Sequence, residues 1–140
     1  MVLADMGADV LKIEELGKGD HTRTIPPLVN GESHYFLAIN RNKRSVVVDL
    51  KRPEGRDIIL KLAAQSDVVL ENFRAGVMDR LGLGFDELCK VKPDIVMCSI
   101  SGFGQTGSMR ETASFDPVSY THLRAHETKA NLVCRLLLEK

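Results

Sequence analysis

Six basic side chains gather around one apolar stretch of the sequence, "NRNKRSVVVDLKRPEGR" at residues 40–56. The chain as a whole has no excess charge, because 19 Lys and Arg balance 19 Asp and Glu. Arg offers a planar fork to phosphate oxygens and Lys offers a point charge, so the segment suits an anionic small molecule such as a phosphorylated cofactor. A solvated loop is the alternative that composition leaves open. The six residues are Arg41, Lys43, Arg44, Lys51, Arg52 and Arg56.

A second polar group, "ENFRAG", follows another apolar stretch. Glu71 and Asn72 supply hydrogen-bonding groups, Phe73 an aromatic face and Arg74 a positive charge. Such a set at the end of a strand is typical of active sites in α/β folds, although many ordinary strand exits have the same composition.

The segment "GFGQTG" (residues 102–107) fits the G-x-G-x-x-G pattern. A dinucleotide site also needs a helix that opens inside the motif and an acidic residue about 20 positions later. The following "SMRETASFDP" has no apolar stripe and supplies neither. We therefore expect a flexible glycine loop beside a ligand. A plain surface turn and a non-enzymatic nucleotide-binding module remain as alternatives.

These groups need elements that bring them together. Apolar, β-branched stretches predict strands at residues 8–14, 44–50, 67–73 and 93–101, with a polar loop between the first two. Helical spacing predicts a helix over 53–65 and one or two short helices over 75–91, broken at Gly82. The alternation predicts an α/β fold with a parallel sheet covered on both faces. Ligands of such sheets gather at the carboxyl ends of the strands, here "DLKRP", "ENFRAG" and "SGFGQTG".

Composition narrows the class of protein. Balanced charge argues against a nucleic-acid or membrane-surface partner, and no apolar run reaches the roughly 18 residues of a membrane span. Three cysteines without paired spacing indicate neither disulfides nor a zinc site, and a cytoplasmic location is expected. Cys89 and Cys98 are expected in the core, and His21 and His34 at the surface.

Four blocks, in order, carry a family resemblance: "ADMGADVLKIEELGKGDHTR", "SHYFLAINRNKRSVVVDLKRPEGR", "DVVLENFRAGVMDRLGLGFDEL" and "PDIVMCSISGFGQTG". Together they closely resemble the N-terminal part of class III CoA-transferases of the CaiB/BaiF type. The resemblance implies a Rossmann-like parallel sheet within the large domain of an interlocked homodimer. It also implies transfer of coenzyme A between carboxylic acids through an aspartyl-CoA thioester, with acyl-CoA and a carboxylic acid as substrates and no metal.

The resemblance also implies which residues contact coenzyme A. The motif "VDLK" carries four of these positions, "ENFR" three, and one more follows in the next helix. The nucleophilic aspartate of the family lies beyond this chain, so we expect the chain to be catalytically incomplete. The racemases of the family remain an alternative, but Phe115 stands where they have a His before Asp116. The coenzyme A positions are Val48, Asp49, Leu50, Lys51, Asn72, Phe73, Arg74 and Arg80.

The resemblance divides the chain at one point. Residues 1–117 are expected to be part of a CoA-transferase large domain without its first strand and second half. Residues 118–140, "VSYTHLRAHETKANLVCRLLLEK", instead resemble the translation of a transposase-type sequencing adapter. His122 and His126 have the one-turn spacing of a metal pair. Under this interpretation, adapter codons set that spacing.

This interpretation predicts the natural gene sequence. Uninterrupted genomic DNA across the locus is expected to continue past Asp116 into family-like sequence that contains the aspartate nucleophile. Sequencing the locus from a single long read is the measurement. A gene that encodes "SYTHLRAHET" at this point contradicts the adapter interpretation.

Overall fold

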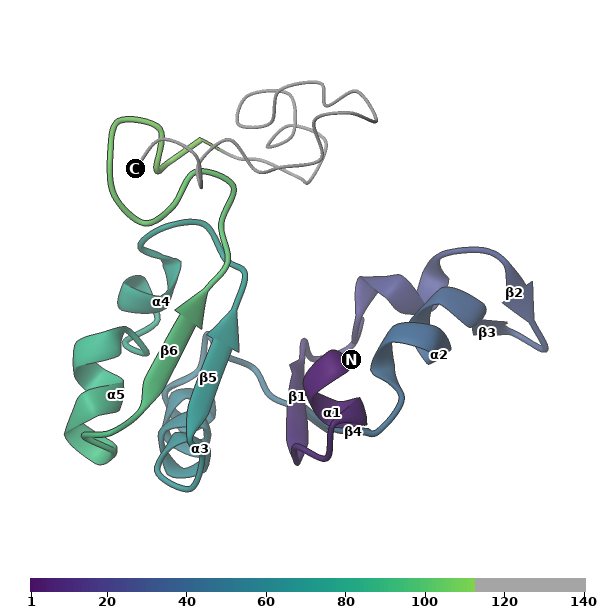
Figure 1. Ribbon diagram of the computed structural model, residues 1–140, viewed down its shortest axis with the longest axis horizontal. Coiled ribbons are helices and arrows are strands. Elements are labelled where there is room, and N and C mark those ends of the chain that lie inside the picture. The colour runs from purple at the N-terminus through teal and green to yellow at the C-terminus, as the bar shows by residue number, and fades with distance from the viewer. Residues whose placement is uncertain (113–140) are drawn as a thin grey trace. The chain divides into compact units, whose positions relative to one another are not determined.

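The computed structural model describes residues 1–112. The chain divides into two compact units, Met1–Ile58 and Ile59–Lys140 (Figure 1). Within residues 1–112 no helix is long and apolar enough to cross a membrane. Both units contain a pair of parallel strands, in agreement with the predicted α/β class.

The first unit contains the parallel pair β1 (Val10–Glu14) and β4 (Lys43–Val47). Their register runs from Val10 opposite Lys43 to Glu14 opposite Val47, so both strands end at the same edge. The short helix α1 (Val2–Asp5) precedes them. Both strands are shorter than predicted, since β1 begins at Val10 rather than Ala8 and β4 ends at Val47 rather than Leu50.

The segment between β1 and β4, predicted as a polar loop, is folded. It contains the 3-10 helix η1 (His21–Thr24), the antiparallel hairpin β2 (Leu28–Val29) and β3 (Glu32–Ser33), and the helix α2 (His34–Asn40). Asn30 and Gly31 form the two-residue turn with positive φ angles of 53° and 83°, as an Asn-Gly hairpin requires. The buried Ser33 caps α2, since its hydroxyl accepts a hydrogen bond from the Phe36 amide at 3.2 Å. The polar-loop prediction was wrong because two-residue strands leave no alternating pattern to read.

The second unit is a β-α-β arrangement. Helix α3 (Pro53–Ala63) begins in the first unit and ends in the second, and β5 (Val68–Glu71) follows it. Two short helices, α4 (Val77–Arg80) and α5 (Phe85–Val91), lead to β6 (Val96–Ser99). Gly82 lies between these helices with a φ of 67°, which confirms the predicted break. Strand β5 pairs in parallel with β6, from Val68 opposite Val96 to Glu71 opposite Ser99.

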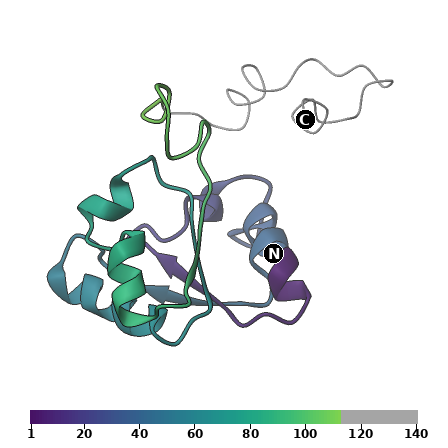
Figure 2. The ribbon, with the colours of Figure 1, turned by 60° about the vertical axis from the view of Figure 1, so that its left-hand side comes forward.

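The core of the second unit joins its helices to its strands. Ala63 of α3, Leu88 of α5 and Ile95 before β6 form the buried cluster, and Figures 1 and 2 show α5 lying beside β6. Partly buried side chains pack around the cluster, among them Cys89, as predicted. The others are Leu60, Val69 and Met97.

One face of the β5–β6 pair differs from the prediction. Side chains alternate across a strand, so Val69 and Met97 face the core while Val68, Leu70 and Val96 point the other way and are 50–57% exposed. The predicted cover on both faces is therefore not seen in the described residues of this unit. Cys98 shares the exposed face with Val96, so its predicted place in the core was wrong.

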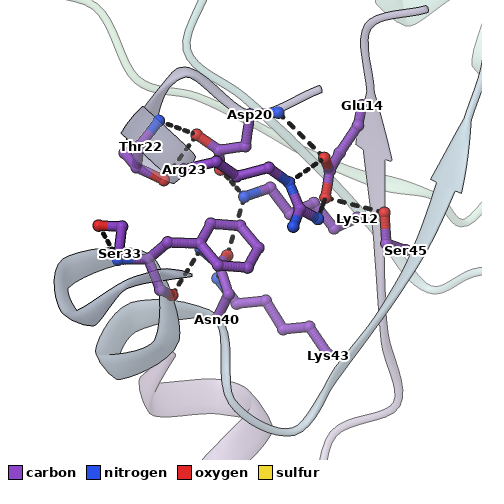
Figure 3. A network of polar contacts seen from close by, with 10 residues as sticks. Lys12, Glu14, Asp20, Thr22, Arg23, Ser33, Asn40, Lys43 and Ser45 are labelled. Carbon is purple, nitrogen blue, oxygen red and sulfur yellow. Dashed lines mark hydrogen bonds and ion pairs between the residues drawn. The ribbon is translucent and has the colours of Figure 1, made fainter. Parts of the chain in front are cut away.

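A buried carboxylate at the end of β1 is the centre of a hydrogen-bond network in the first unit (Figure 3). Glu14 is 5% exposed and accepts four hydrogen bonds. Arg23 donates two of them, from Nε at 3.1 Å and Nη2 at 3.0 Å, and Ser45 Oγ of β4 donates a third at 2.8 Å. The Asp20 amide donates the fourth at 3.0 Å. Glu14 therefore ties the loop after β1 to the neighbouring strand.

A second set of contacts extends this network to α2. Lys12 Nζ donates to Asn40 Oδ1 at 2.9 Å and forms an ion pair with Asp20, and Lys43 Nζ donates to the same Asn40 oxygen at 3.0 Å. The Arg23 guanidinium lies over the Phe36 ring, 3.9 Å from its centroid. These contacts hold α2 and β4 in one arrangement, from which the polar segment after β4 leaves.

We predict that the Glu14→Gln change lowers the free energy of unfolding by about 2 kcal/mol at neutral pH, since charge-assisted hydrogen bonds are replaced by weaker ones. Hydrogen bonds from Arg23 hold the pKa of Glu14 below its ordinary value of 4.5. A lowered folded-state pKa gives stability that is present above that ordinary value and is lost as the pH falls through the folded-state value. The difference between the wild type and Glu14→Gln is therefore expected to shrink in acid.

Urea unfolding of both proteins over a pH series measures this difference. The matched control is Glu15→Gln, which changes the exposed neighbouring carboxylate and is expected to leave the neutral-pH stability within about 0.5 kcal/mol of wild type. A constant gap between wild type and Glu14→Gln from neutral to acid pH contradicts the assignment.

Candidate functional site

The first candidate segment, residues 48–51, leaves β4 at the edge where β1 ends. Val48 is 6% exposed, and its amide donates to the Glu14 carbonyl at 3.1 Å, so the segment is anchored at its first residue. Asp49 then turns the chain, because its Oδ1 accepts from the Lys51 amide at 3.0 Å and its carbonyl accepts from the Arg52 amide at 3.2 Å. Helix α3 begins two residues after Lys51, and helix N-termini favour negative charge.

A glycine in the first turn of α3 lets the backbone of this segment pack closely against the helix. A Cβ added to Gly55 would lie 1.9 Å from the Asp49 carbonyl oxygen and 3.2 Å from Val48 Cγ1. No side chain fits at such a distance, so the backbone of the segment rests directly on the helix. The absence of a side chain at Gly55 therefore sets how closely residues 48–51 approach the backbone of α3.

The basic cluster around β4 is largely neutralised by partners. Arg41 binds Asp5 (Nη2–Oδ2 2.6 Å) and Arg44 binds Asp9 at the same distance. The hydrogen bond from Arg41 lowers the pKa of Asp5. Lys51 is exposed, and among the described residues its side chain has no ion pair. Lys51 is thus left available for a ligand.

Two further basic residues of the cluster, Lys43 and Arg52, have local partners. Lys43 donates to Asn40, and Arg52 lies 4.0 Å from the Asp49 carboxylate, a long and exposed ion pair. Exposed pairs of this kind contribute little and are easily exchanged for a ligand contact. The anion site in this segment therefore stays a prediction, and the internal pairing favours its part around residues 49–52.

The second candidate segment, residues 72–74, follows β5 in the other unit. Asn72, Phe73 and Arg74 are all exposed, with Phe73 at 40%. Glu71, which ends the strand, is 7% exposed, and its Oε2 accepts from the Phe73 amide at 2.6 Å. The three side chains therefore project from a turn whose backbone is held by a buried carboxylate.

Arg80 lies close to the same turn. Gly76 adopts a positive φ of 75° before α4, and a Cβ added there would lie 3.5 Å from Arg80 Nη1. The exposed guanidinium thus returns from the end of α4 toward the residues that follow Arg74. Of the predicted site residues, Asn72, Phe73, Arg74 and Arg80 belong to the second unit, whereas residues 48–51 belong to the first.

The glycine segment leaves β6 beside the second candidate segment. The Ile100 amide donates to the Glu71 carbonyl at 2.8 Å, so the two strand ends stay together. Gly104 and Gly107 have φ angles of 82° and 89°, and residues 101–112 contain no helix. This confirms that the helix required by a dinucleotide motif is missing. Ser101 Oγ is buried and has no hydrogen-bond partner among the described residues, which leaves one polar atom at this edge unsatisfied.

Other candidate residues give no site in the described part of the chain. Within residues 1–112 there is no group of three His, Cys, Asp or Glu side chains that could hold a metal. His21 and His34 are exposed, as predicted. The metal-like spacing of His122 and His126, together with Phe115 and Asp116, lies outside the described residues.

The family described as CoA-transferase family III matches residues 1–123 of the chain. The chain belongs to CoA-transferase family III. The match extends past residue 117, and the boundary of the adapter-like segment stays a prediction.

Curated relatives in family III agree with this assignment. Succinyl-CoA:glutarate CoA-transferase from Mus musculus is 48% identical over 120 residues, which are 85% of this chain and 28% of the relative. Acetyl-CoA:oxalate CoA-transferase from Acetobacter aceti is 46% identical, over 84% of this chain and 30% of the length of that relative. The chain thus spans less than a third of the length of these relatives.

Solved structures show the same fold. A CAIB/BAIF family protein from Brucella suis has a TM-score of 0.75 and 44% identity, over 81% of this chain and 31% of that chain. A protein from Mycobacterium tuberculosis has a TM-score of 0.80 and 35% identity, over 93% of this chain and 38% of that chain. The chain therefore has the α/β fold of this family and covers only part of its large domain.

Sequence reasoning missed the residues that hold the candidate segments in place. Glu14 and Glu71 both end apolar strands, where a buried side chain is expected, and this position was an available signal. Gly55 lies in the first turn of a predicted helix, although glycine is unfavourable in helices by about 1 kcal/mol, and this too was a signal. None of the three was predicted to act on the loops.

We predict that Gly55→Ala destabilises the protein by about 1–3 kcal/mol, the usual cost of overpacking. Alanine gains up to about 1 kcal/mol in helix propensity, but the Asp49 carbonyl is backbone and cannot rotate away, so the clash outweighs the gain. The free energy of unfolding and the amide resonances of residues 48–51 are the measurements. Asp57→Ala, an exposed change in the same helix, is the control, and equal stability of the two variants contradicts the close approach.

Proposed function

We infer that the intact protein transfers coenzyme A from an acyl-CoA to a carboxylic acid. The observation that carries this proposal is the match to CoA-transferase family III over residues 1–123, which includes every candidate strand end. The curated relatives carry the names of CoA-transferases that act on succinyl-CoA or acetyl-CoA with glutarate or oxalate. The substrate class proposed for this protein is accordingly an acyl-CoA with a carboxylic acid.

The proposed chemistry needs a carboxylate nucleophile. An aspartate attacks the acyl-CoA carbonyl, which forms a mixed anhydride and releases the coenzyme A thiolate. The thiolate then attacks the aspartyl carbonyl of the anhydride, which gives an aspartyl-CoA thioester and releases the donor as its carboxylate. The acceptor carboxylate repeats the two steps in reverse, so that acceptor acyl-CoA leaves and the aspartate is regenerated. No redox or metal step is needed for this balance.

The described residues supply groups suited to coenzyme A rather than to the reacting carbonyl. Lys51, Arg74 and Arg80 are exposed cations that suit the phosphates of the nucleotide. The Phe73 ring offers an exposed aromatic face, and the Asn72 amide offers a donor and an acceptor. Residues 48–51, 72–74 and 80 are therefore proposed to contact coenzyme A, in an intact protein that works as an interlocked homodimer.

We predict that coenzyme A binds the 140-residue chain and that NAD does not. Lys51→Ala and Arg74→Ala are each expected to weaken binding about tenfold, because each removes one charge-assisted contact to phosphate. Isothermal titration with coenzyme A and with NAD measures both affinities. Tight NAD binding without a response to coenzyme A contradicts the proposal and favours a non-enzymatic nucleotide-binding module.

Arg44→Ala is the matched control, since Arg44 is exposed and paired with Asp9 and is expected to leave the affinity within about twofold. Because the nucleophile is proposed to lie outside this sequence, no transfer of coenzyme A is expected from the chain itself. Measured turnover on the 140-residue chain contradicts that part of the proposal.

A further inference from the structure

We propose that Glu71 is a positioning residue of the coenzyme A site, which acts by holding the backbone of residues 72–74 in the conformation that binds the ligand. The proposal rests on the proposed function, since it concerns the site named there. Glu71 itself is buried and is not proposed to touch coenzyme A. Its role is exerted through the Phe73 amide, to which its carboxylate is hydrogen bonded.

The position of Glu71 in the strand is the first observation. Val69 faces the core of the second unit, and Glu71, two residues later, lies on the same face and is 7% exposed. An apolar side chain there would gain from burial, whereas a carboxylate loses hydration. A charge at this position therefore lowers the stability of the fold. A second role of the carboxylate is needed to explain why it is there.

The hydrogen bond of this carboxylate is the second observation. Its Oε2 accepts from the Phe73 amide at 2.6 Å, in the loop that follows β5, and among the described residues no side chain of the core donates to it. Bonds from an amide to a charged oxygen are short and about twice as strong as neutral ones. The contact therefore offsets part of the free energy lost when the carboxylate is buried. It also orders the backbone of the loop.

The lack of other supports in residues 72–74 is the third observation. These residues belong to neither a strand nor a helix. The sheet ladder ends at Glu71, whose carbonyl accepts from the Ile100 amide, and the next turn is closed only where the Val77 amide donates to the Arg74 carbonyl at 3.1 Å. Between these two points the Glu71–Phe73 bond is the contact that fixes the backbone among the described residues. All three intervening side chains are exposed and free to meet a ligand.

Loss of this bond is expected to weaken coenzyme A binding without removing any ligand contact. Ordering the backbone of one residue corresponds to a factor of about ten in an equilibrium constant, and a loose loop must be ordered on binding. Glu71→Ala is therefore expected to weaken binding about tenfold. Glu71→Gln keeps a neutral acceptor for the Phe73 amide and is expected to lose about threefold.

The experiment combines two measurements on the 140-residue chain. Titration with coenzyme A gives the affinity, and the chemical shift of the Phe73 amide proton reports its hydrogen bond, which is expected downfield in the wild type, less so in Glu71→Gln and least in Glu71→Ala. Both are made at a temperature at which circular dichroism shows the variants fully folded. A purely structural role predicts wild-type affinity under that condition. Asp94→Asn, which changes a carboxylate that is 80% exposed in the same unit, is the control and is expected to alter neither reading.

The outcomes separate this inference from the proposed function. Parallel loss of affinity and of the downfield shift, in the order wild type, Gln, Ala, supports it. A folded Glu71→Ala that binds coenzyme A as the wild type does overturns it alone. Should Glu71→Ala not fold, a folded Glu71→Gln with an altered Phe73 shift and unchanged affinity overturns it equally. Failure of the wild type to bind coenzyme A overturns the proposed function, and this inference with it.

Discussion

A carboxylate taken out of water must be given hydrogen-bond donors, and in both units this requirement fixes the loop after a parallel strand. Glu14 ends β1 and bonds the Asp20 amide, while Glu71 ends β5 and bonds the Phe73 amide. In each case the donor comes from the chain that has just left the sheet. The buried carboxylate at each strand end thus orders the loop that follows it, and after β5 that loop carries the candidate ligand contacts.

Parallel pairing gives these loops their shared position. The register places Glu14 opposite Val47 and Glu71 opposite Ser99, so two segments leave each pair at the same edge. Further backbone contacts continue past the ladders, where Val48 donates to Glu14 and Ile100 donates to Glu71. Gly55 adds a steric limit in the first unit, since the Asp49 carbonyl occupies the space of a side chain. The candidate segments therefore depend on contacts that contain no group proposed to be catalytic.

Periodicity was sufficient to predict the longer elements but not the shorter ones. The apolar spacing in α3 and the β-branched run of β4 carry many residues, so both were found with small errors at their ends. The β2–β3 hairpin has two residues in each strand, too few to show an alternation of apolar and polar residues. Its Asn-Gly turn was the one signal in the sequence that indicated a hairpin. Cys98 was misplaced because an apolar strand does not reveal which of its two faces is covered.

The candidate site was harder to predict because the charge that a basic segment offers to a ligand depends on ion-pair partners elsewhere in the chain. Arg41 precedes β4 and Arg44 lies within it, and both raise the number of basic residues in this segment. Asp5 and Asp9, more than 30 positions away, pair with them. Lys51 gains its importance from the lack of such a partner among the described residues. A ligand phosphate is attracted by the charge that remains after internal pairing, and that remainder depends on contacts distant in the sequence. Composition can therefore point to a candidate anion site near β4, but only the fold shows which of its basic residues are left unpaired.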